Sequence, residues 1–136
     1  MKKQQATIYE GKKGIKHLFD ESLRQKEDIL VLGGGGKFKE HFPEYSELWH
    51  KLRIKAKIKL KLLYDEGLRE KNIIYEKCEI KFLPKEFDNP SPTMIYGDKV
   101  VITLWEKIPL AFVIESKEVA RSYKTYFGVL WKIAKS

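Results

Sequence analysis

The clearest pattern of hydrophobic and polar positions lies in residues 93–131. Two apolar runs, residues 100–105 and 110–114, flank a short Glu-Lys-Ile-Pro connector, which is typical of a β-hairpin. After Ser116, a suitable N-cap, apolar residues recur at spacings of three and four and predict an amphipathic helix that ends the chain. The stripe expected to face a core consists of Val119, Ala120, Tyr123, Phe127, Leu130 and Ala134.

The first part of the chain alternates between helical and extended patterns. Residues 1–8 are polar and are expected to form a linker or a disordered N-terminus. Residues 9–26 have apolar positions at helical spacing, and residues 28–32 form a short apolar run that predicts a buried strand. This strand is ended abruptly by four consecutive glycines, Gly33, Gly34, Gly35 and Gly36.

The period of the pattern changes near the middle of the chain. Helical spacing begins at Tyr45 and ends near Arg53, after which apolar residues alternate with lysines. A period of two predicts a strand over residues 57–63 with one buried side and one open side. Because the open side would carry lysines, we expect this strand to lie near a sheet edge or to have an uncovered face. The lysines are Lys55, Lys57, Lys59 and Lys61.

The remaining residues complete an α/β fold. A short helix over residues 66–71 is followed by a strand over residues 77–82 that ends before Pro84, and residues 86–92 form a loop. A strand at residues 94–96 and a tight turn then lead into the hairpin. We therefore predict one domain, residues 9–136, with a mixed sheet, parallel βαβ units early, a late antiparallel hairpin and flanking helices.

Charge and composition narrow the possible functions only slightly. The formal net charge of +8 invites nucleic-acid binding, but most of the positive charge is lysine dispersed along the chain. Dispersed lysine usually covers a surface, whereas base and phosphate recognition favours arginine. A single cysteine, Cys78, excludes a disulfide framework, and no apolar run could span a bilayer. A cytoplasmic protein without a membrane partner is expected.

Two small groups of residues are candidates for ligand binding. Gly33–Gly36 and Lys37 follow a predicted strand, where backbone N–H groups can surround an anion, although a plain flexible connector is the alternative. His50 and Arg53 lie one turn apart on a predicted helix and could reach a ligand or a second subunit together, or simply face solvent. No spacing of acidic residues or histidines suggests a metal site or a cofactor.

Several segments resemble a known family. The hairpin with its terminal helix, which ends in Phe127-x-x-x-Trp131, is similar to the closing part of a phospholipase D-like domain. Residues 9–15, 49–59 and 95–101 follow in the order found in the effector domain of archaeal TrmB-like transcriptional regulators. This resemblance implies a phospholipase D-like fold, a homodimer and a small, anionic metabolite as ligand. It also implies that DNA is reached only through a winged helix-turn-helix domain, which this chain lacks; we therefore expect a fragment of a longer regulator.

The catalytic motif of phospholipase D-like enzymes has no counterpart in this sequence. That motif is His-x-Lys followed four residues later by Asp, in which histidine is the nucleophile. The chain has His17, His41 and His50, and the residues two positions after them are Phe19, Pro43 and Leu52. From this absence we predict that the chain is not an enzyme but an effector and dimerisation domain.

Two other functions compete with this prediction. A hydrolase or transferase could hold a phosphate or a nucleotide with the Gly33–Gly36 loop, but no nucleophile and base are paired near it. Alternatively, the alternating lysines could bind nucleic acid directly. The homodimer hypothesis also has support from the residues, because one domain of this size would have difficulty covering all of its aromatic side chains. Trp105 and Trp131 are the candidate interface residues.

Overall fold

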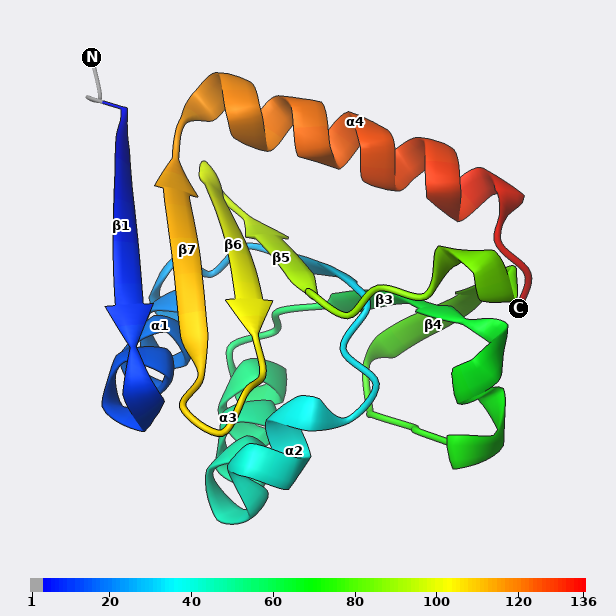
Figure 1. The fold of residues 1–136 in the computed structure, drawn as a ribbon, viewed down its shortest axis with the longest axis horizontal. Coiled ribbons are helices and arrows are strands. Elements are labelled where there is room, and N and C mark those ends of the chain that lie inside the picture. The colour runs from blue at the N-terminus through cyan, green and yellow to red at the C-terminus, as the bar shows by residue number, and fades with distance from the viewer. Residues whose placement is uncertain (1–3) are drawn as a thin grey trace.

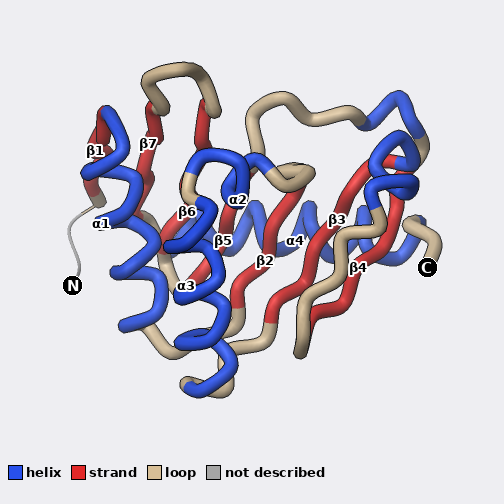
Figure 2. The backbone as a smooth tube through the Cα atoms, turned by 90° about the horizontal axis from the view of Figure 1, so that it is seen from below, coloured by secondary structure: helices blue, strands red, loops and turns tan. Residues whose placement is uncertain are grey.

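The computed structural model describes residues 4–136 and shows one seven-stranded sheet with helices on both faces. The strand order is β1-β7-β6-β5-β2-β3-β4. In Figure 2 the helices α1, α2 and α3 lie in front of the sheet and α4 lies behind it. The predicted mixed α/β architecture is therefore confirmed.

The strands divide into a parallel half and an antiparallel half. The central strand β2 pairs in parallel with β3, which pairs in parallel with β4, whereas β2 and β5, β5 and β6, β6 and β7, and β7 and β1 pair antiparallel. The bounds are β1 (Gln5–Glu10), β2 (Ile29–Leu32), β3 (Leu60–Asp65), β4 (Cys78–Leu83), β5 (Thr93–Tyr96), β6 (Lys99–Leu104) and β7 (Leu110–Glu115).

The helices form largely where the sequence predicts them. The α-helices are α1 (Gly11–Arg24), α2 (Lys37–His41), α3 (Pro43–Lys55) and α4 (Lys117–Ile133), and two 3₁₀-helices are η1 (Glu66–Lys71) and η2 (Lys85–Phe87). Ser116 caps α4 as predicted, because its Oγ accepts a hydrogen bond from the Val119 N–H at 3.3 Å. None of the helices in the described part of the chain is long and apolar enough to cross a membrane.

Each face of the sheet has its own hydrophobic cluster. The cluster on the face covered by α1 and α3 is the larger of the two, and it includes Leu18 of α1 and Trp49 of α3, both almost fully buried. On the other face, the buried side of α4 packs Ala120 and Phe127 against the sheet. This is the stripe predicted from the spacing of apolar residues. In Figure 1, α4 crosses the strands at the top of the molecule and α1 and α3 lie below.

The prediction of an unstructured segment at residues 1–8 is wrong for Gln5 and the residues after it. Gln5–Glu10 forms β1, which pairs along its whole length with β7 at one edge of the sheet. Most of its side chains are exposed, so the segment lacks the alternation of buried and exposed residues that identifies a strand in a sequence. Residues 1–3 lie outside the described residues.

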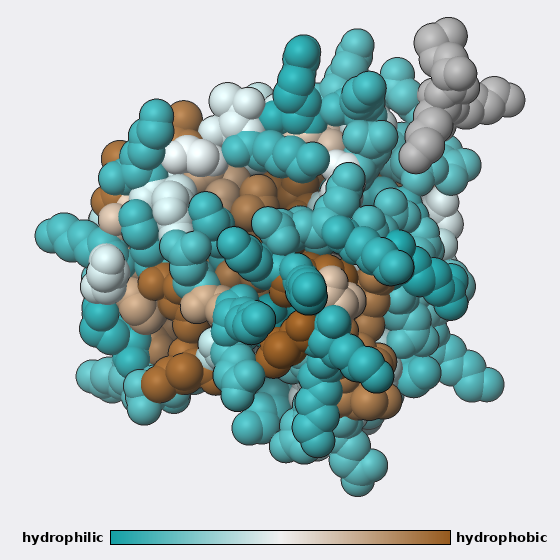
Figure 3. All heavy atoms as spheres, turned by 180° about the vertical axis from the view of Figure 1, so that it is seen from behind, coloured by the Kyte–Doolittle hydropathy of each residue, from teal (hydrophilic) through white to brown (hydrophobic). Residues whose placement is uncertain are grey.

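The predicted row of lysines on an edge strand does not form. Lys55 ends α3, Lys57 has a positive φ of 61° in the turn that follows, and Lys59 precedes β3. Only Lys61 lies on β3, which is near an edge of the sheet as predicted, between β2 and the edge strand β4. Figure 3 shows hydrophilic side chains covering most of one face of the molecule, with apolar atoms visible between them.

Candidate ligand-binding site

A partly open cavity of about 90 Å³ lies at the carboxyl end of β2, on the α1 and α3 side of the sheet. The glycine loop that follows β2 and the start of α2 form one wall, and β3, β5 and β6 contribute residues to the others. At this position β2 has a parallel neighbour, β3, and an antiparallel one, β5. Ligand sites of open α/β sheets commonly lie outside the carboxyl ends of strands.

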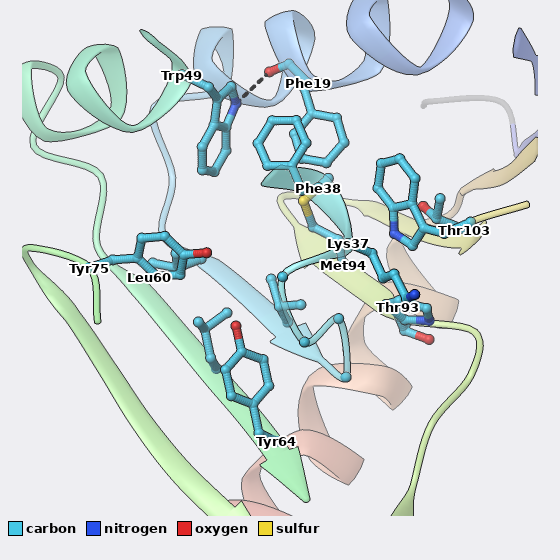
Figure 4. Close-up of a pocket in the computed structure, with 18 of the residues that line it drawn as sticks. Phe19, Lys37, Phe38, Trp49, Leu60, Tyr64, Tyr75, Thr93, Met94 and Thr103 are labelled. Atoms are coloured by element: carbon cyan, nitrogen blue, oxygen red, sulfur yellow. Dashed lines mark hydrogen bonds between the residues drawn. The ribbon is translucent and has the colours of Figure 1, made fainter. Parts of the chain in front are cut away.

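The upper wall is made of interlocked aromatic rings (Figure 4). Phe19 of α1 and Phe38 of α2 stack with centroids 3.9 Å apart, and Trp49 of α3 meets Phe38 edge-on at 5.7 Å. The indole of Trp49 is fixed in place because its Nε1–H donates to the Phe19 carbonyl oxygen at 2.9 Å. This wall is therefore apolar, and a hydrogen bond between two of its own residues holds it in position.

The polar side chains that line the cavity can all donate hydrogen bonds. In Figure 4 the hydroxyls of Tyr64 and Tyr75 point into the space from different sides. Among the hydrogen bonds formed by residues 4–136, none uses either hydroxyl. Lys37, His50, Thr93 and Thr103 also line the cavity; Lys37 is paired with Glu40 at 3.4 Å, the Thr93 hydroxyl donates to the Ser91 carbonyl at 3.5 Å, and no carboxylate lines the cavity. The site therefore presents donors without a negative charge.

His50 enters the cavity as a neutral side chain. Burial and the nearby charge of Arg53 lower the pKa of His50 to about 4, so its ring is uncharged at neutral pH. The ring stacks on Tyr75, with centroids 4.2 Å apart. Because a guanidinium can only donate, Nδ1 of His50, 3.4 Å from Arg53 Nε, acts as an acceptor. The proton of the neutral ring is therefore on Nε2.

Arg53 does not share the cavity with His50, although the sequence places them together as ligand-binding candidates. The side chain is fully buried, and its guanidinium donates to the carbonyl oxygens of Ile58 at 3.0 Å, Lys77 at 3.1 Å and Glu76 at 2.7 Å. These bonds occupy the donors that a ligand would need. The interpretation of Arg53 as a ligand-binding residue is therefore corrected: its contacts fix the end of α3 to the segment before β4.

The glycine loop lines the cavity with backbone rather than with side chains. All four glycines have positive φ angles, between 62° and 114°. A Cβ atom at Gly33 would approach Asn89 to 3.1 Å, and one at Gly35 would approach the end of the Leu68 side chain to 3.0 Å, so a larger residue would be tight at both positions in addition to the strain of a positive φ. The N–H of Gly33 donates to the Leu63 carbonyl at 2.8 Å. Within the described residues, the N–H groups of Gly34, Gly35 and Gly36 form no hydrogen bond.

The two tryptophans chosen as interface candidates lie on different faces of the sheet. Trp105 follows β6 and contributes to the cavity wall, where its ring centroid is 5.0 Å from that of His41. Trp131 lies on α4, stacks on Phe127 at 5.7 Å and is approached by Lys61 and Lys81. The pair does not form one surface patch, and both side chains are partly buried within the monomer.

Several lining residues were not recognised in the sequence. Tyr64 is one of them, although Leu60, Leu62 and Tyr64 alternate along β3 and all face the cavity. The period of two extends one residue beyond the predicted end of the strand, which is the signal that could have revealed it. Tyr75 comes from an irregular segment that no pattern marks. Among residues 4–136, no group of three or more His, Cys, Asp or Glu side chains could hold a metal ion.

Comparison with known proteins identifies the fold. No family model matches the chain, and no curated protein matches its sequence. NucT from Helicobacter pylori is similar in structure, with a TM-score of 0.69 and 10% identity over 98% of this chain and 99% of that chain. Nuc from Salmonella typhimurium, a phospholipase D family member, has a TM-score of 0.62 and 10% identity over 98% and 97%.

A third similar structure is TrmBL2, described as an archaeal chromatin protein with a novel mode of DNA binding. Its TM-score is 0.63 at 19% identity, over 96% of this chain but only 54% of that chain, so the chain corresponds to about half of TrmBL2. At such identities these similarities show the fold alone. The chain has a phospholipase D-like fold, as the sequence resemblance implied.

The prediction that the chain is not an enzyme is contradicted by these comparisons. Nuc belongs to the phospholipase D family, and both Nuc and NucT share the fold over nearly the whole chain, so this architecture is one that enzymes use. The prediction rested on a missing His-x-Lys motif. That absence concerns one route of phosphodiester cleavage, and it does not place the chain outside the class of enzymes.

Proposed function

We propose that the chain is a ligand-binding effector domain and that the cavity beside the glycine loop binds a small anion with a short apolar body. One observation carries the proposal: the cavity combines aromatic and aliphatic walls with polar groups that donate, and no carboxylate lines it. The oxygens of an acidic ligand would find hydrogen-bond donors in the cavity. An ammonium group would find no carboxylate to balance its charge.

The size of the cavity limits the ligand. An engineered cavity of about 150 Å³ holds benzene, so a volume of about 90 Å³ suits a branched aliphatic group or part of a ring. The charged end would lie near Lys37 and the N–H groups of Gly34 to Gly36, which form no hydrogen bonds among the described residues. The hydroxyls of Tyr64 and Tyr75 would supply the remaining donors.

The similarity to TrmBL2 supports a role beside DNA. Because TrmBL2 is an archaeal chromatin protein that binds DNA, we infer that this chain is the effector part of a TrmB-like regulator, in which ligand binding would alter association with DNA or with a second subunit. Binding of the anion is expected whether or not the chain also catalyses a reaction of the bound compound.

Calorimetric titration tests the ligand class. The probes are isovalerate and benzoate, with the neutral isopentanol and benzyl alcohol as matched compounds. The acids are expected to bind at least about tenfold more tightly than the alcohols, because charge-assisted hydrogen bonds are roughly twice as strong as neutral ones. Equal affinity for acids and alcohols, or no binding by either acid, would contradict the proposal.

Variants locate the binding site. Tyr64→Phe removes one hydroxyl from the cavity, and Lys37→Met removes the one lysine among its lining residues. Each variant is expected to bind the acids about fivefold to tenfold more weakly, equivalent to one lost hydrogen bond. Tyr126→Phe on exposed α4 and Lys39→Met on the outer side of α2 are the matched controls and should leave affinity unchanged. Equal losses in test and control variants would show that binding occurs elsewhere.

A further inference from the structure

The exposed surface of α4 divides into two flanks of different chemistry. With 3.6 residues per turn, one side of the buried stripe carries Lys117, Arg121, Lys124, Gly128 and Lys132, all exposed. The only acidic residue of this helix is Glu118. The opposite side carries the exposed apolar residues Tyr126, Val129 and Ile133. Basic and apolar side chains are therefore segregated on one helix.

The basic flank continues onto the sheet at the C-terminal end of α4. Nζ of Lys61 lies 5.1 Å and Nζ of Lys81 lies 4.8 Å from the centre of the Trp131 ring, and Lys81 also donates to the Trp131 carbonyl oxygen at 3.4 Å. The two ammonium groups thus gather around one indole, close to the negative end of the helix dipole. We call Lys61, Lys81, Lys117, Arg121, Lys124 and Lys132 the basic strip.

The basic strip is not neutralised by the chain itself. The ion pairs formed by residues 4–136 involve Lys16, His17, Lys37, Arg69 and Lys99, and none includes a member of the strip. Like charges at one-turn spacing along a helix repel one another. An anionic partner that lies against the strip would relieve this repulsion.

Gly128 provides a second, independent observation on the same flank. It lies inside α4, where glycine destabilises a helix by about 0.5–1 kcal/mol relative to alanine. A Cβ atom at this position would meet nothing within 4 Å, so packing within the chain does not require a glycine. Between Lys124 and Lys132 it leaves a flat place in the strip where another molecule can approach the helix backbone closely.

We propose that the basic strip binds the phosphodiester backbone of a nucleic acid. From Lys117 to Lys132 the helix is about 22 Å long, which equals the rise of about six or seven base pairs along a duplex axis at roughly 3.4 Å each. Lysine-rich contacts of this kind hold the backbone and do not distinguish bases. The inferred partner is double-stranded DNA, reached directly by this domain rather than only through a separate helix-turn-helix.

The arrangement of the two flanks distinguishes DNA from an anionic membrane. A helix that lies on an anionic membrane buries its apolar side, and its basic residues must still reach the lipid headgroups. In α4 the basic residues occupy one side, and turning Tyr126 and Val129 toward a bilayer would turn Arg121 and Lys124 away from it. The strip also lies on the opposite face of the sheet from the ligand-binding cavity, so DNA binding and ligand binding can be tested independently.

Fluorescence anisotropy with a labelled duplex of mixed sequence, measured from 50 to 300 mM salt, tests the proposal. The triple variant Arg121→Glu, Lys124→Glu, Lys132→Glu is compared with Lys13→Glu, Lys51→Glu, Lys107→Glu, which changes the net charge equally at exposed positions outside the strip. At about 0.9 units of slope for each phosphate contact, the strip variant should lower the salt dependence by about 2.7. At low salt we expect an affinity loss of at least about 100-fold, against less than about fivefold for the control.

Three outcomes would overturn the proposal. The first is equal weakening by the two triple variants, which would mean that dispersed charge alone attracts DNA. The second is no salt-dependent binding by the unaltered chain. The third is loss of binding to phosphatidylserine vesicles in the strip variant while its DNA binding is unchanged. Circular dichroism melting curves confirm that each variant is folded before it is compared.

Gly128 gives a test that leaves the net charge unchanged. Gly128→Ala should raise the melting temperature because it removes the cost of a helical glycine. Gly128→Leu should leave the fold intact, since the position faces open space, but weaken DNA binding by about tenfold by holding the backbone away from the strip. Unaltered DNA affinity in Gly128→Leu would contradict the close approach at this position.

Discussion

His50 shows how the surroundings of one side chain set its charge. It stacks on Tyr75 and accepts a hydrogen bond from Arg53, and burial lowers its pKa to about 4, below the ordinary value of about 6.5. Between these two values the unfolded chain binds a proton that the folded chain does not. Stability contributed by the neutral ring is therefore fully present above pH 6.5 and decreases as the pH falls toward 4, by up to about 3 kcal/mol.

Urea unfolding at pH 7, 5.5 and 4.5 checks this prediction. His50→Gln removes the titrating group, so its free energy of unfolding should decline less between pH 7 and 4.5 than that of the unaltered chain. His17→Gln, at an exposed position on α1, should retain the full decline. If His50→Gln shows the same pH dependence as the unaltered chain, another group is responsible.

The sequence identified the proximity of His50 and Arg53 but not their environments. Their spacing on a helix is sufficient to place them within hydrogen-bonding distance. It cannot show which side of the helix is buried, because the carbonyls that receive Arg53 belong to Glu76 and Lys77, far away in the sequence. No local sequence pattern reveals an arginine whose hydrogen-bond partners are backbone carbonyls of a distant loop.

Arg53 acts between elements, because it joins the end of α3 to Ile58 in the turn that leads to β3 and to the segment that leads into β4. Replacing it with leucine would remove the guanidinium donors from three carbonyl oxygens, one of them in a buried and two in part-buried hydrogen bonds. We expect Arg53→Leu to lower the free energy of unfolding by about 3–5 kcal/mol.

Chemical denaturation measures this loss. Arg53→Lys should restore only part of the stability, because an ammonium cannot reproduce the fixed geometry of the guanidinium donors. Arg24→Leu, at an exposed position at the end of α1, should change the free energy by less than about 0.5 kcal/mol. A loss below about 1 kcal/mol for Arg53→Leu would show that the contacts of this side chain contribute little.

Most elements could be predicted because their patterns are local. The hairpin of β6 and β7 and the stripe of α4 follow directly from apolar spacing and from a capping serine. The alternating lysines misled the prediction because residues 55–61 cross a helix end, a turn and a strand start, and each element happens to expose a lysine. Periodicity describes one element at a time and cannot detect that a segment changes element within seven residues.

At the scale of the whole molecule, the homodimer remains a proposal, and we place its contact on the terminal helix α4. Tyr126, Val129 and Ile133 form an exposed apolar flank on α4, with exposed fractions of 60%, 58% and 57%. Apolar groups gathered in this way favour an interface between subunits. Sedimentation equilibrium should give a mass near 32 kDa, twice the 16.0 kDa of one chain.

A pair of variants places the contact. Val129→Glu should shift the mass toward 16.0 kDa, because a buried carboxylate without a partner is strongly unfavourable at an interface. Ile74→Glu, at a residue that is 75% exposed and lies outside α4, is the matched control and should remain dimeric. A chain that stays monomeric while its concentration rises tenfold would contradict the dimer itself.

The sheet could be assigned from the sequence to the mixed α/β class, but β1 at its edge could not be predicted. The cavity is likewise assembled from α1, α3, β3, β5 and the segment after η1, and their meeting depends on the order of the strands. The glycine loop could be recognised as one wall because glycine runs are conspicuous, whereas the aromatic residues opposite it have the same spacing as any core.

The pairing of β1 with β7 has a consequence for synthesis on the ribosome. Gln5 and Glu115 are 110 residues apart, so the first strand is made long before its partner exists. At about 5–20 residues per second, β1 waits on the order of 5–20 s without its hydrogen-bonding neighbour. Its exposed, polar composition, Gln-Ala-Thr-Ile-Tyr-Glu, lets the nascent segment stay solvated during that delay. The property that hides β1 from prediction thus protects the emerging chain from premature association.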